Sequence, residues 1–232
     1  MWDVFPYPCV GEFGFLDLNL CQRAAYPDIV RRLKSSQSAR HLDIGCCVGQ
    51  DIRKLVYDGV LPQQIVGIEL QQGFVSLGFE LFRDAGSLDA RFVIADMLAD
   101  TDTGDDKLVG LYGSADTVHI GHVLHLFSRE QQVKFLQRVI TLCKSQPGVV
   151  IVGHCIGNVK AGPAAGAMGS SSMRHNVESW TQLWEELSKL TGSGWELRTA
   201  LDDKLGYGPS PSGWRDPNWR RLVFEVVRQE TA

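Results

Sequence analysis

The pattern of apolar and polar residues along the chain alternates between two kinds of segment. Short apolar runs predict strands at residues 41–45, 64–70, 91–97, 116–120 and 149–153. Between them, apolar residues at helical spacing predict helices over 51–57, 73–85 and 128–144. A run as apolar as 149–153 is typical of the centre of a parallel sheet, which is buried on both faces. The alternation therefore predicts an open α/β sheet with right-handed crossovers.

The C-terminal third of the chain departs from this alternation. A helix is predicted over 178–190, and two strands, 195–201 and 221–227, follow without a helix between them. We expect a seven-stranded, mostly parallel Rossmann-like sheet with one antiparallel C-terminal strand and helices on both faces. A dinucleotide-binding domain would use a sixth parallel strand instead. The whole chain, 1–232, is predicted to be a single domain.

Two segments do not fit the strand and helix pattern. Residues 1–25 are rich in aromatic residues and broken by Pro and Gly, which forbids a long helix. We expect them to form an apolar lid with Phe15 against a substrate, although the same aromatic residues can simply pack on the sheet. Residues 157–176, which begin with a Gly, Ala and Ser rich stretch, are predicted to be a mobile loop on the substrate side.

Composition narrows the choice of partner and compartment. The net charge is −4 and no long basic block occurs, so nucleic acid is not expected as a partner. No apolar run approaches the roughly 20 residues of a membrane span. The six cysteines match neither a zinc site nor a disulfide framework, and we interpret them as free thiols in a reducing compartment. A soluble, cytoplasmic protein is expected, and the oligomeric state stays open, a homodimer included.

The first strand leads into a glycine turn that can hold a ligand. The stretch LDIGCCVGQD places Asp43 at the strand end, where it can accept a hydrogen bond from a ligand ammonium group. Gly45, Cys46 and Gly49 form the turn, in which glycines let the backbone approach a ligand closely. Asp51 lies in the helix start, whose unpaired N–H groups suit a ligand carboxylate.

The next strands also end in polar residues suited to a nucleoside. Glu69 ends the second strand, where an acid can accept from both ribose hydroxyls, and Leu70 follows it. Asp96 ends the third strand and can accept from an adenine amino group, while Met97 offers contact with the ring. His119, at the end of the fourth strand, is expected beside the amino-acid part of the ligand. NAD is disfavoured because the G-x-G-x-x-G pattern is absent.

The order of these acids resembles motifs I, II and III of class I S-adenosylmethionine-dependent methyltransferases. The resemblance implies S-adenosyl-L-methionine as the cofactor and S-adenosyl-L-homocysteine as its product. Position 47 is cysteine where the common pattern of that class has glycine.

A narrower resemblance covers almost the whole chain. The stretches FPYPCVGEFGFLDL, LDIGCCVGQDIRKLVYDG, GFELFRDAGSL and RHNVESW are similar to small fungal methyltransferases of meroterpenoid pathways, in which vicinal cysteines also follow the glycine. That resemblance implies an enzyme that methyl-esterifies the carboxylate of a hydrophobic polyketide–terpenoid intermediate.

Candidate acceptor-side residues follow the fourth strand and the 157–173 stretch. His125 and Arg174 are expected to act in catalysis, Arg174 by binding the acceptor carboxylate. His122, His175 and Asn176 are expected to contact the substrate. His119, His122 and His125 are spaced at three-residue steps, but no further ligand completes the set, so no metal is expected.

Two alternatives to the carboxylate acceptor stay open. The same cofactor can serve methylation of a phenol, with His125 as a base, or of a ring carbon. A protein that binds S-adenosylmethionine without transferring the methyl group belongs to a different class. Intact acids at positions 43, 69 and 96 favour binding but do not establish transfer.

Overall fold

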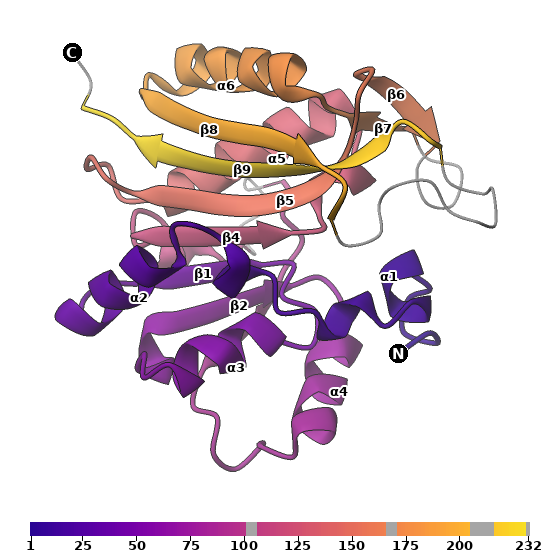
Figure 1. Ribbon diagram of the computed structural model, residues 1–232. Helices are drawn as coiled ribbons and strands as arrows, with labels where there is room; N and C mark the ends of the chain where they lie inside the picture. Colours follow the sequence, from indigo (N-terminus) through magenta and orange to yellow (C-terminus); the bar gives the residue numbers. More distant parts are fainter. Residues whose placement is uncertain (101–105, 166–170, 205–215, 231–232) are drawn as a thin grey trace. The chain divides into compact units, whose positions relative to one another are not determined.

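The structure is a computed structural model that describes residues 1–100, 106–165, 171–204 and 216–230 (Figure 1). The chain forms two compact units. Unit 1 comprises Met1–Gly121 and Leu142–Lys144, and unit 2 comprises His122–Thr141 and Ser145–Ala232. Each unit is described separately below. None of the helices in the described ranges has the length and apolar content needed to cross a bilayer.

Unit 1 contains four parallel strands and the helices that connect them. The strands are β1 (His41–Ile44), β2 (Ile65–Glu69), β3 (Arg91–Ile94) and β4 (Thr117–Gly121). The main helices are α2 (Tyr26–Ser35), α3 (Gln50–Tyr57) and α4 (Gln72–Phe82). Short helical turns complete the unit: α1 (Pro8–Gly11), η1 (Gly14–Leu16), η2 (Leu20–Gln22), η3 (Pro62–Gln64) and η5 (Val109–Leu111).

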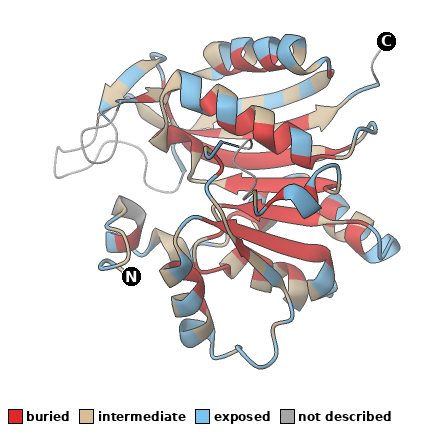
Figure 2. Ribbon diagram, turned by 180° about the vertical axis from the view of Figure 1, so that it is seen from behind, coloured by how far each residue is buried: buried red, intermediate tan, exposed pale blue. Residues whose placement is uncertain are grey.

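The register of these strands brings the predicted polar residues to one edge. Asp43 on β1 lies opposite His119 on β4, and Glu69 on β2 lies opposite Ile94 of β3. All these pairings are parallel, so the loops that follow the four strands leave from the same edge. We call this the carboxyl edge of unit 1. Strands β1 and β2 are buried along their whole length, as the continuous burial in Figure 2 shows.

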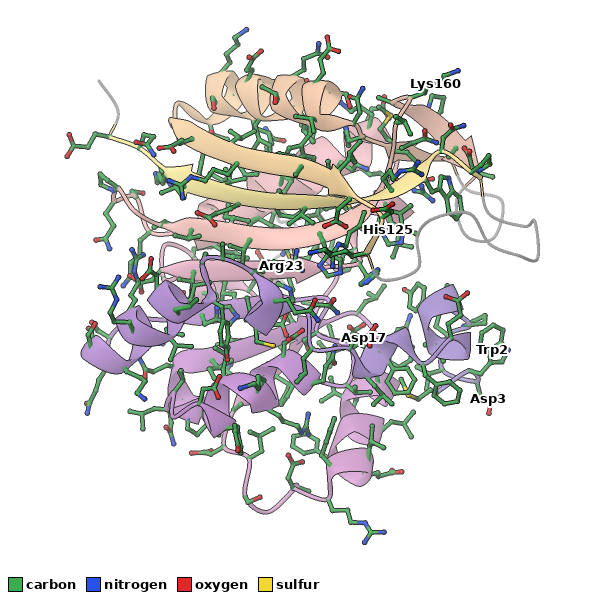
Figure 3. The ribbon with its side chains drawn as sticks, viewed as in Figure 1. Trp2, Asp3, Asp17, Arg23, His125 and Lys160 are labelled. Atoms are coloured by element: carbon green, nitrogen blue, oxygen red, sulfur yellow. The ribbon has the colours of Figure 1, made fainter. Side chains whose placement is uncertain are left out.

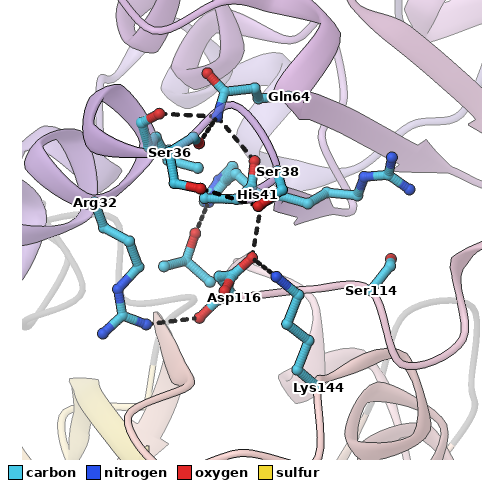
Figure 4. Close-up of polar contacts among 12 residues, drawn as sticks. Arg32, Ser36, Ser38, His41, Gln64, Ser114, Asp116 and Lys144 are labelled. Atoms are coloured by element: carbon cyan, nitrogen blue, oxygen red, sulfur yellow. Dashed lines mark hydrogen bonds and ion pairs between the residues drawn. The ribbon is translucent and has the colours of Figure 1, made fainter.

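The opposite edge of unit 1 is held by a network of buried polar side chains (Figure 4). His41 Nδ1 lies 2.8 Å from Thr117 Oγ1, and Asp116 accepts from the backbone N–H of Arg40 and from Lys144. Burial lowers the pKa of His41 to about 4, so its imidazole is neutral at pH 7. This network joins β1 to β4 and has no part in the carboxyl edge.

Unit 2 contains the remaining strands and two long helices. It begins with the turn η6 (Leu124–Leu126) and α5 (Arg129–Leu142), the last residue of which belongs to unit 1. The strands are β5 (Val150–Asn158), β6 (Gly162–Ala165), β7 (Ser171–Arg174), β8 (Trp195–Asp202) and β9 (Trp219–Arg228), with α6 (Val177–Thr191) between β7 and β8. Strand β9 is antiparallel to β5 and to β8. Trp180 of α6 packs on Phe224 of β9, with 4.7 Å between ring centroids.

The predicted fold class is confirmed. The seven-stranded sheet has the order β3-β2-β1-β4-β5-β9-β8, with six parallel strands and the antiparallel β9. The two final strands are adjacent, as expected from the lack of a helix between them. Some bounds were wrong: β3 ends at Ile94, short of residue 97, and β5 continues to Asn158, beyond residue 153. The prediction of a single domain stays a prediction.

The predicted loop at 157–176 contains a two-stranded antiparallel sheet, β6 with β7. The prediction of a loop was wrong for these strands, because strand propensity depends on context and the hydrogen bonds between β6 and β7 outweigh the weak preference of small residues. Ser172 Oγ donates to the carbonyl of Ala164, and Met173 N–H donates to the carbonyl of Phe127. Residues 166–170 lie outside the described residues, and the mobility of the segment stays a prediction.

Candidate functional site

The glycine turn after β1 uses backbone conformations that explain its sequence. Gly45, Cys47 and Gly49 all have positive φ values, of 75°, 51° and 72°. Glycine adopts this left-handed region without cost, whereas a side chain there is strained. Cys47 therefore occupies a position where glycine would be unstrained. Gly45 N–H donates to the carbonyl of Ile68 at 2.8 Å, which ties the turn to the end of β2.

Glu69 links the first two turns of the carboxyl edge. Its Oε2 accepts from Cys47 N–H at 3.0 Å, and its Oε1 accepts from Gln71 N–H at 2.9 Å. Burial raises the pKa of Glu69, although these hydrogen bonds partly oppose the shift. A carboxylate oxygen can accept two hydrogen bonds. Glu69 therefore retains acceptor capacity for a pair of ribose hydroxyls.

Asp43 and His119 form a buried pair on neighbouring strands. Asp43 Oδ1 lies 2.8 Å from His119 Nδ1, and the residues are 3% and 2% exposed. Burial opposes a charge on His119, but the Asp43 and Asp51 carboxylates outweigh it and raise the pKa of His119. The pair fixes Asp43 at the strand end, where its second oxygen has no hydrogen-bond partner among the described residues. Asp43 therefore has an oxygen available for a ligand ammonium group, and that contact stays a prediction.

The third strand contributes an exposed acid and a buried thioether. Asp96 Oδ1 accepts from Leu98 N–H at 2.8 Å, which orients the carboxylate after β3. Met97 is buried, whereas Leu70, after β2, is 49% exposed. The contacts of Asp96, Met97 and Leu70 with the cofactor stay predictions.

Asp51 has a structural role that was not expected. Its carboxylate accepts from Leu20 N–H at 3.0 Å and from Asn19 N–H at 3.4 Å. Burial raises the pKa of Asp51 to about 6. Both oxygens bind the backbone that precedes α2, so Asp51 anchors the N-terminal segment to the start of α3. Its contact with the cofactor stays a prediction.

The aromatic residues of the N-terminal segment pack on unit 1. Phe5 and Tyr7 have ring centroids 4.2 Å apart, and Tyr7 lies 6.0 Å from Phe74 of α4. Phe15 is half-buried beside Phe13. Figure 3 shows Trp2 at the far end of this segment. Packing is thus the observed role of Phe5 and Tyr7, and the lid and the substrate contact of Phe15 stay predictions.

In unit 2, three histidines and an arginine lie close together. His122 and His154 have ring centroids 4.3 Å apart, and those of His122 and His125 are 6.1 Å apart. Arg174, at the end of β7, donates through Nη1 to the carbonyl of His125. Its guanidinium lies 5.6 Å from the ring centroid of Trp219. Cys155 lies near the same arginine. Figure 3 shows His125 at the end of β5.

Arg174 is buried without an acidic partner. It is 5% exposed, and no described carboxylate forms an ion pair with it. The undescribed segments of unit 2, apart from the chain end, contain no Asp or Glu in their sequence. Burial lowers the pKa of Arg174, and it raises that of the neighbouring Cys155 to about 12. A buried guanidinium in such a position is suited to bind an anion.

Curated relatives show the family of the chain. No family model matches it. O-methyltransferase phiE of a fungal species is 43% identical over 96% of this chain and 77% of the relative. O-methyltransferase atr3 of Stereocaulon alpinum is 41% identical over 98% of this chain and 64% of the relative. The chain belongs to the fungal secondary-metabolite methyltransferases. The predicted family is confirmed, and the chain spans between 64% and 77% of the length of these two relatives.

Solved structures agree on the fold of this methyltransferase. A phosphoethanolamine N-methyltransferase of Haemonchus contortus, solved with S-adenosylhomocysteine, aligns over 98% of this chain and 60% of its own, with a TM-score of 0.61 and 16% identity. The (4+2)-cyclase SpnF aligns over 89% and 80%, with a TM-score of 0.59 and 17% identity. The expected cofactor agrees with the first of these structures. The second is named a cyclase, so the fold alone does not define the reaction.

Two residues of the methyltransferase that were predicted to contact the substrate have structural roles. His175 uses both ring nitrogens, with Nε2 2.7 Å from Gln132 Oε1 and Nδ1 2.9 Å from Ser179 Oγ. Asn176 is the N-cap of α6 and accepts from Ser179 N–H. Both ring nitrogens of His175 and the side-chain oxygen of Asn176 thus have structural partners, and the substrate contact of these two residues stays a prediction. His122, with a φ of 57°, shapes the turn after β4, and its substrate contact stays a prediction.

Gln132 and Trp219 are residues that the sequence analysis missed. Gln132 Nε2 donates to the carbonyls of Leu124 and Met173, at 2.9 Å and 3.1 Å, and so joins η6 to β7. A polar residue on the apolar stripe of α5 could have revealed it, since Phe135 and Leu136 share its face. Trp219 gave no comparable signal. The five cysteines whose side chains are described form no disulfide, and among described residues no group of three potential ligands could hold a metal.

Proposed function

We propose that this methyltransferase transfers the methyl group of S-adenosylmethionine to a carboxylate oxygen of a hydrophobic small molecule. The observation that carries the proposal is the buried guanidinium of Arg174, which has no acidic partner in the described chain. The names of two relatives, both O-methyltransferases, support an oxygen acceptor. Another relative is named an Asnovolin E/Chermesin D methyltransferase, and such names agree with a small-molecule acceptor.

The carboxyl edge of unit 1 fits the cofactor. Asp43 has an oxygen available for the ammonium group, and Glu69 has acceptor capacity for the ribose hydroxyls. The turn from Gly45 to Gly49 is compact, and a Cβ added at Gly49 would lie 2.9 Å from Arg53. When bound, S-adenosylmethionine supplies a methyl group on a positively charged sulfur. The protein supplies position and the exclusion of water.

A carboxylate acceptor needs little help from the protein to react. With a pKa of about 4 it is ionised at pH 7, so one oxygen can attack the methyl carbon as the carbon–sulfur bond breaks. No proton has to move. A phenol, with a pKa of about 10, would benefit from a base. His125 is a poor candidate for that base, because burial and the charge of Arg174 hold its pKa well below the usual value.

Replacement of Arg174 tests the proposal. Arg174→Met removes the charge but keeps much of the apolar volume, and Arg174→Lys is the matched variant that keeps a charge. We expect Arg174→Met to raise the Michaelis constant for the acid by about 10–150-fold, which corresponds to a lost charged hydrogen bond. Turnover should fall less, because the arginine binds the carboxylate in ground and transition states alike.

A control measurement separates this effect from damage to the cofactor site, and a pH profile tests the acceptor independently. The affinity for S-adenosylmethionine, measured by titration calorimetry, should stay unchanged in both variants. The rate of the native enzyme should stay flat from neutral to moderately alkaline pH, because the acceptor is ionised throughout. An unchanged Michaelis constant in Arg174→Met, or a rate that climbs steadily with pH, would contradict the carboxylate acceptor.

A further inference from the structure

We infer that His125 acts as a neutral hydrogen-bond donor to the acceptor carboxylate and forms, with Arg174, a two-donor anion site in unit 2. This inference rests on the proposed function. In this inference His125 orients one oxygen of the acceptor carboxylate and does not act as a base. Three features of unit 2 carry it: the contacts that fix the two residues together, their unused polar atoms, and the charges around them.

The first feature is the rigid connection between the two residues. Arg174 Nη1 donates to the backbone carbonyl of His125, so the guanidinium ties the end of β7 to η6. The same pair is joined twice more. Met173 N–H donates to the carbonyl of Phe127 at 2.8 Å, and Gln132 bonds to carbonyls on both sides. The guanidinium of Arg174 and the backbone that carries His125 are therefore held together by contacts within the protein.

The second feature is a pair of polar atoms without a partner. His125 Nδ1 and Arg174 Nε are buried and have no hydrogen bond to the protein. The residues are 9% and 5% exposed. A buried polar atom without a hydrogen-bond partner is unfavourable, and a ligand that accepts from both atoms would satisfy them. By contrast, the neighbouring His175 has partners for both ring nitrogens.

The third feature is the charge around His125. Arg174 and His122 face it, and both disfavour a second positive charge, as does burial. Among the described residues, no carboxylate pairs with either His125 or Arg174. A neutral imidazole carries one N–H donor and one acceptor nitrogen. A carboxylate only accepts, so the N–H of His125 is the group that can face it.

This arrangement defines the class of ligand and favours release of the product. A monocarboxylate can accept from both residues, and an apolar body can pack against Trp219, which already lies beside the guanidinium. Methyl transfer forms an ester, which has no negative charge. The ester therefore loses the ionic part of its interaction with Arg174, so it should bind more weakly than the acid.

Nuclear magnetic resonance of the histidine ring tests the protonation state directly. In protein labelled with ¹⁵N at histidine, the His125 signals are assigned by their loss in His125→Asn. We expect a neutral ring with one protonated nitrogen from pH 6 to pH 8.5. A ring that is charged at pH 7, or that titrates near its ordinary pKa of about 6.5, would overturn the inference.

Titration with benzoate, and with benzamide as its uncharged counterpart, tests the donor role. Benzoate should shift both the His125 ring signals and the Arg174 Nε–H signal, and benzamide should shift neither. A response of Arg174 without one of His125 overturns the inference and leaves the carboxylate acceptor standing. No response of either residue to benzoate also overturns it.

Substitutions that keep one donor supply the kinetic test. Asn places an amide N–H near the position of Nδ1, Gln places one near Nε2, and Leu places none. We expect His125→Leu to raise the Michaelis constant for the acid about tenfold, and one of the two amide variants to restore most of the loss. Replacement of His41, the buried histidine at the opposite edge of unit 1, by Gln controls for loss of a buried imidazole.

Two further outcomes would decide between the inference and the proposed function. If all three His125 variants form methyl ester with the native Michaelis constant, the inference fails and the proposed function stands. If the variants lose turnover in a manner that depends on pH, and the product is an aryl ether, the proposed function itself fails.

Discussion

The two units of this methyltransferase differ in how their buried charged side chains are paired. At the carboxyl edge of unit 1, buried acids have partners: Asp43 with His119, and Glu69 with two backbone N–H groups. In the described part of unit 2, no carboxylate pairs with the buried Arg174, and its titratable neighbours are His125 and Cys155. An acid held by the backbone can present a fixed acceptor to a polar cofactor. A buried cation without an acidic partner can instead bind the negative charge of a ligand.

This difference predicts that acid weakens unit 2 before unit 1. Burial, with Arg129 nearby, lowers the pKa of His175 to about 4. A histidine whose pKa is depressed in the folded state contributes stability above about pH 6.5 that is lost as the pH falls towards 4. The loss from His175 amounts to about 3 kcal/mol of unfolding free energy. His125 acts in the same direction.

Unit 1 has a compensating group. His41 loses stability in acid in the same way, but Asp51 has a pKa raised to about 6. An acid with a raised folded pKa favours the folded state more as the pH falls from about 6 to about 4. Amide hydrogen exchange is measured at pH 7 and pH 5 and corrected for intrinsic rates. Between these two pH values the exchange rates should increase more in unit 2 than in unit 1. A larger increase in unit 1 than in unit 2 would contradict this comparison. An unchanged increase in unit 2 of the His175→Gln variant would contradict it as well.

Glu69→Ala should weaken binding of S-adenosylmethionine by about 10–150-fold, because it removes a charged acceptor worth about 1.5–3 kcal/mol. Glu69→Gln keeps one acceptor oxygen and should lose less. Titration calorimetry measures both affinities, and circular dichroism checks that the variants fold. Unchanged affinity in Glu69→Ala would remove Glu69 from the cofactor site.

Asp51→Ala should lower the unfolding free energy by about 1–3 kcal/mol, since the N–H groups of Asn19 and Leu20 lose their acceptor. Asp51→Asn keeps an acceptor oxygen and should lose less stability. Denaturant unfolding measures both. If Asp51→Ala unfolds at the native midpoint but loses cofactor affinity as strongly as Glu69→Ala, Asp51 belongs to the cofactor site after all.

Removal of metal ions should have no effect on turnover. Displacement at a sulfonium carbon by an ionised acid requires no Lewis acid, so activity should survive incubation with EDTA. Activity that disappears with EDTA and returns with one divalent ion would revive the histidines at 119, 122 and 125 as ligands.

The sequence was most informative where function depends on local position along parallel strands. Asp43 lies near the end of β1, Glu69 ends β2 and Asp96 follows β3. Parallel pairing then brings these strand ends to one edge without any long-range information. The anchoring role of Asp51 was missed because its partners, Asn19 and Leu20, lie 32 and 31 residues away in sequence. Local position alone could not reveal such a contact.

Asn176 and Arg174 show which structural roles the sequence could reveal and which it could not. The pattern Asn176-x-x-Ser179 before an apolar run is typical of a helix N-cap, so its structural role was available from the sequence. The burial of Arg174 was not available, since it depends on contacts with His125 and Trp219 that only the tertiary structure forms. The substrate side is harder to predict for this reason.

The most direct test of the carboxylate acceptor uses hydrophobic molecules that carry both a carboxylate and a phenolic hydroxyl. The enzyme is incubated with them and with S-adenosylmethionine labelled in its methyl group, and the labelled product is treated with mild alkali. We predict that alkali releases the label as methanol, because the product is a methyl ester formed beside Arg174. Label that survives alkali, as an aryl ether or on carbon, would contradict the proposed acceptor.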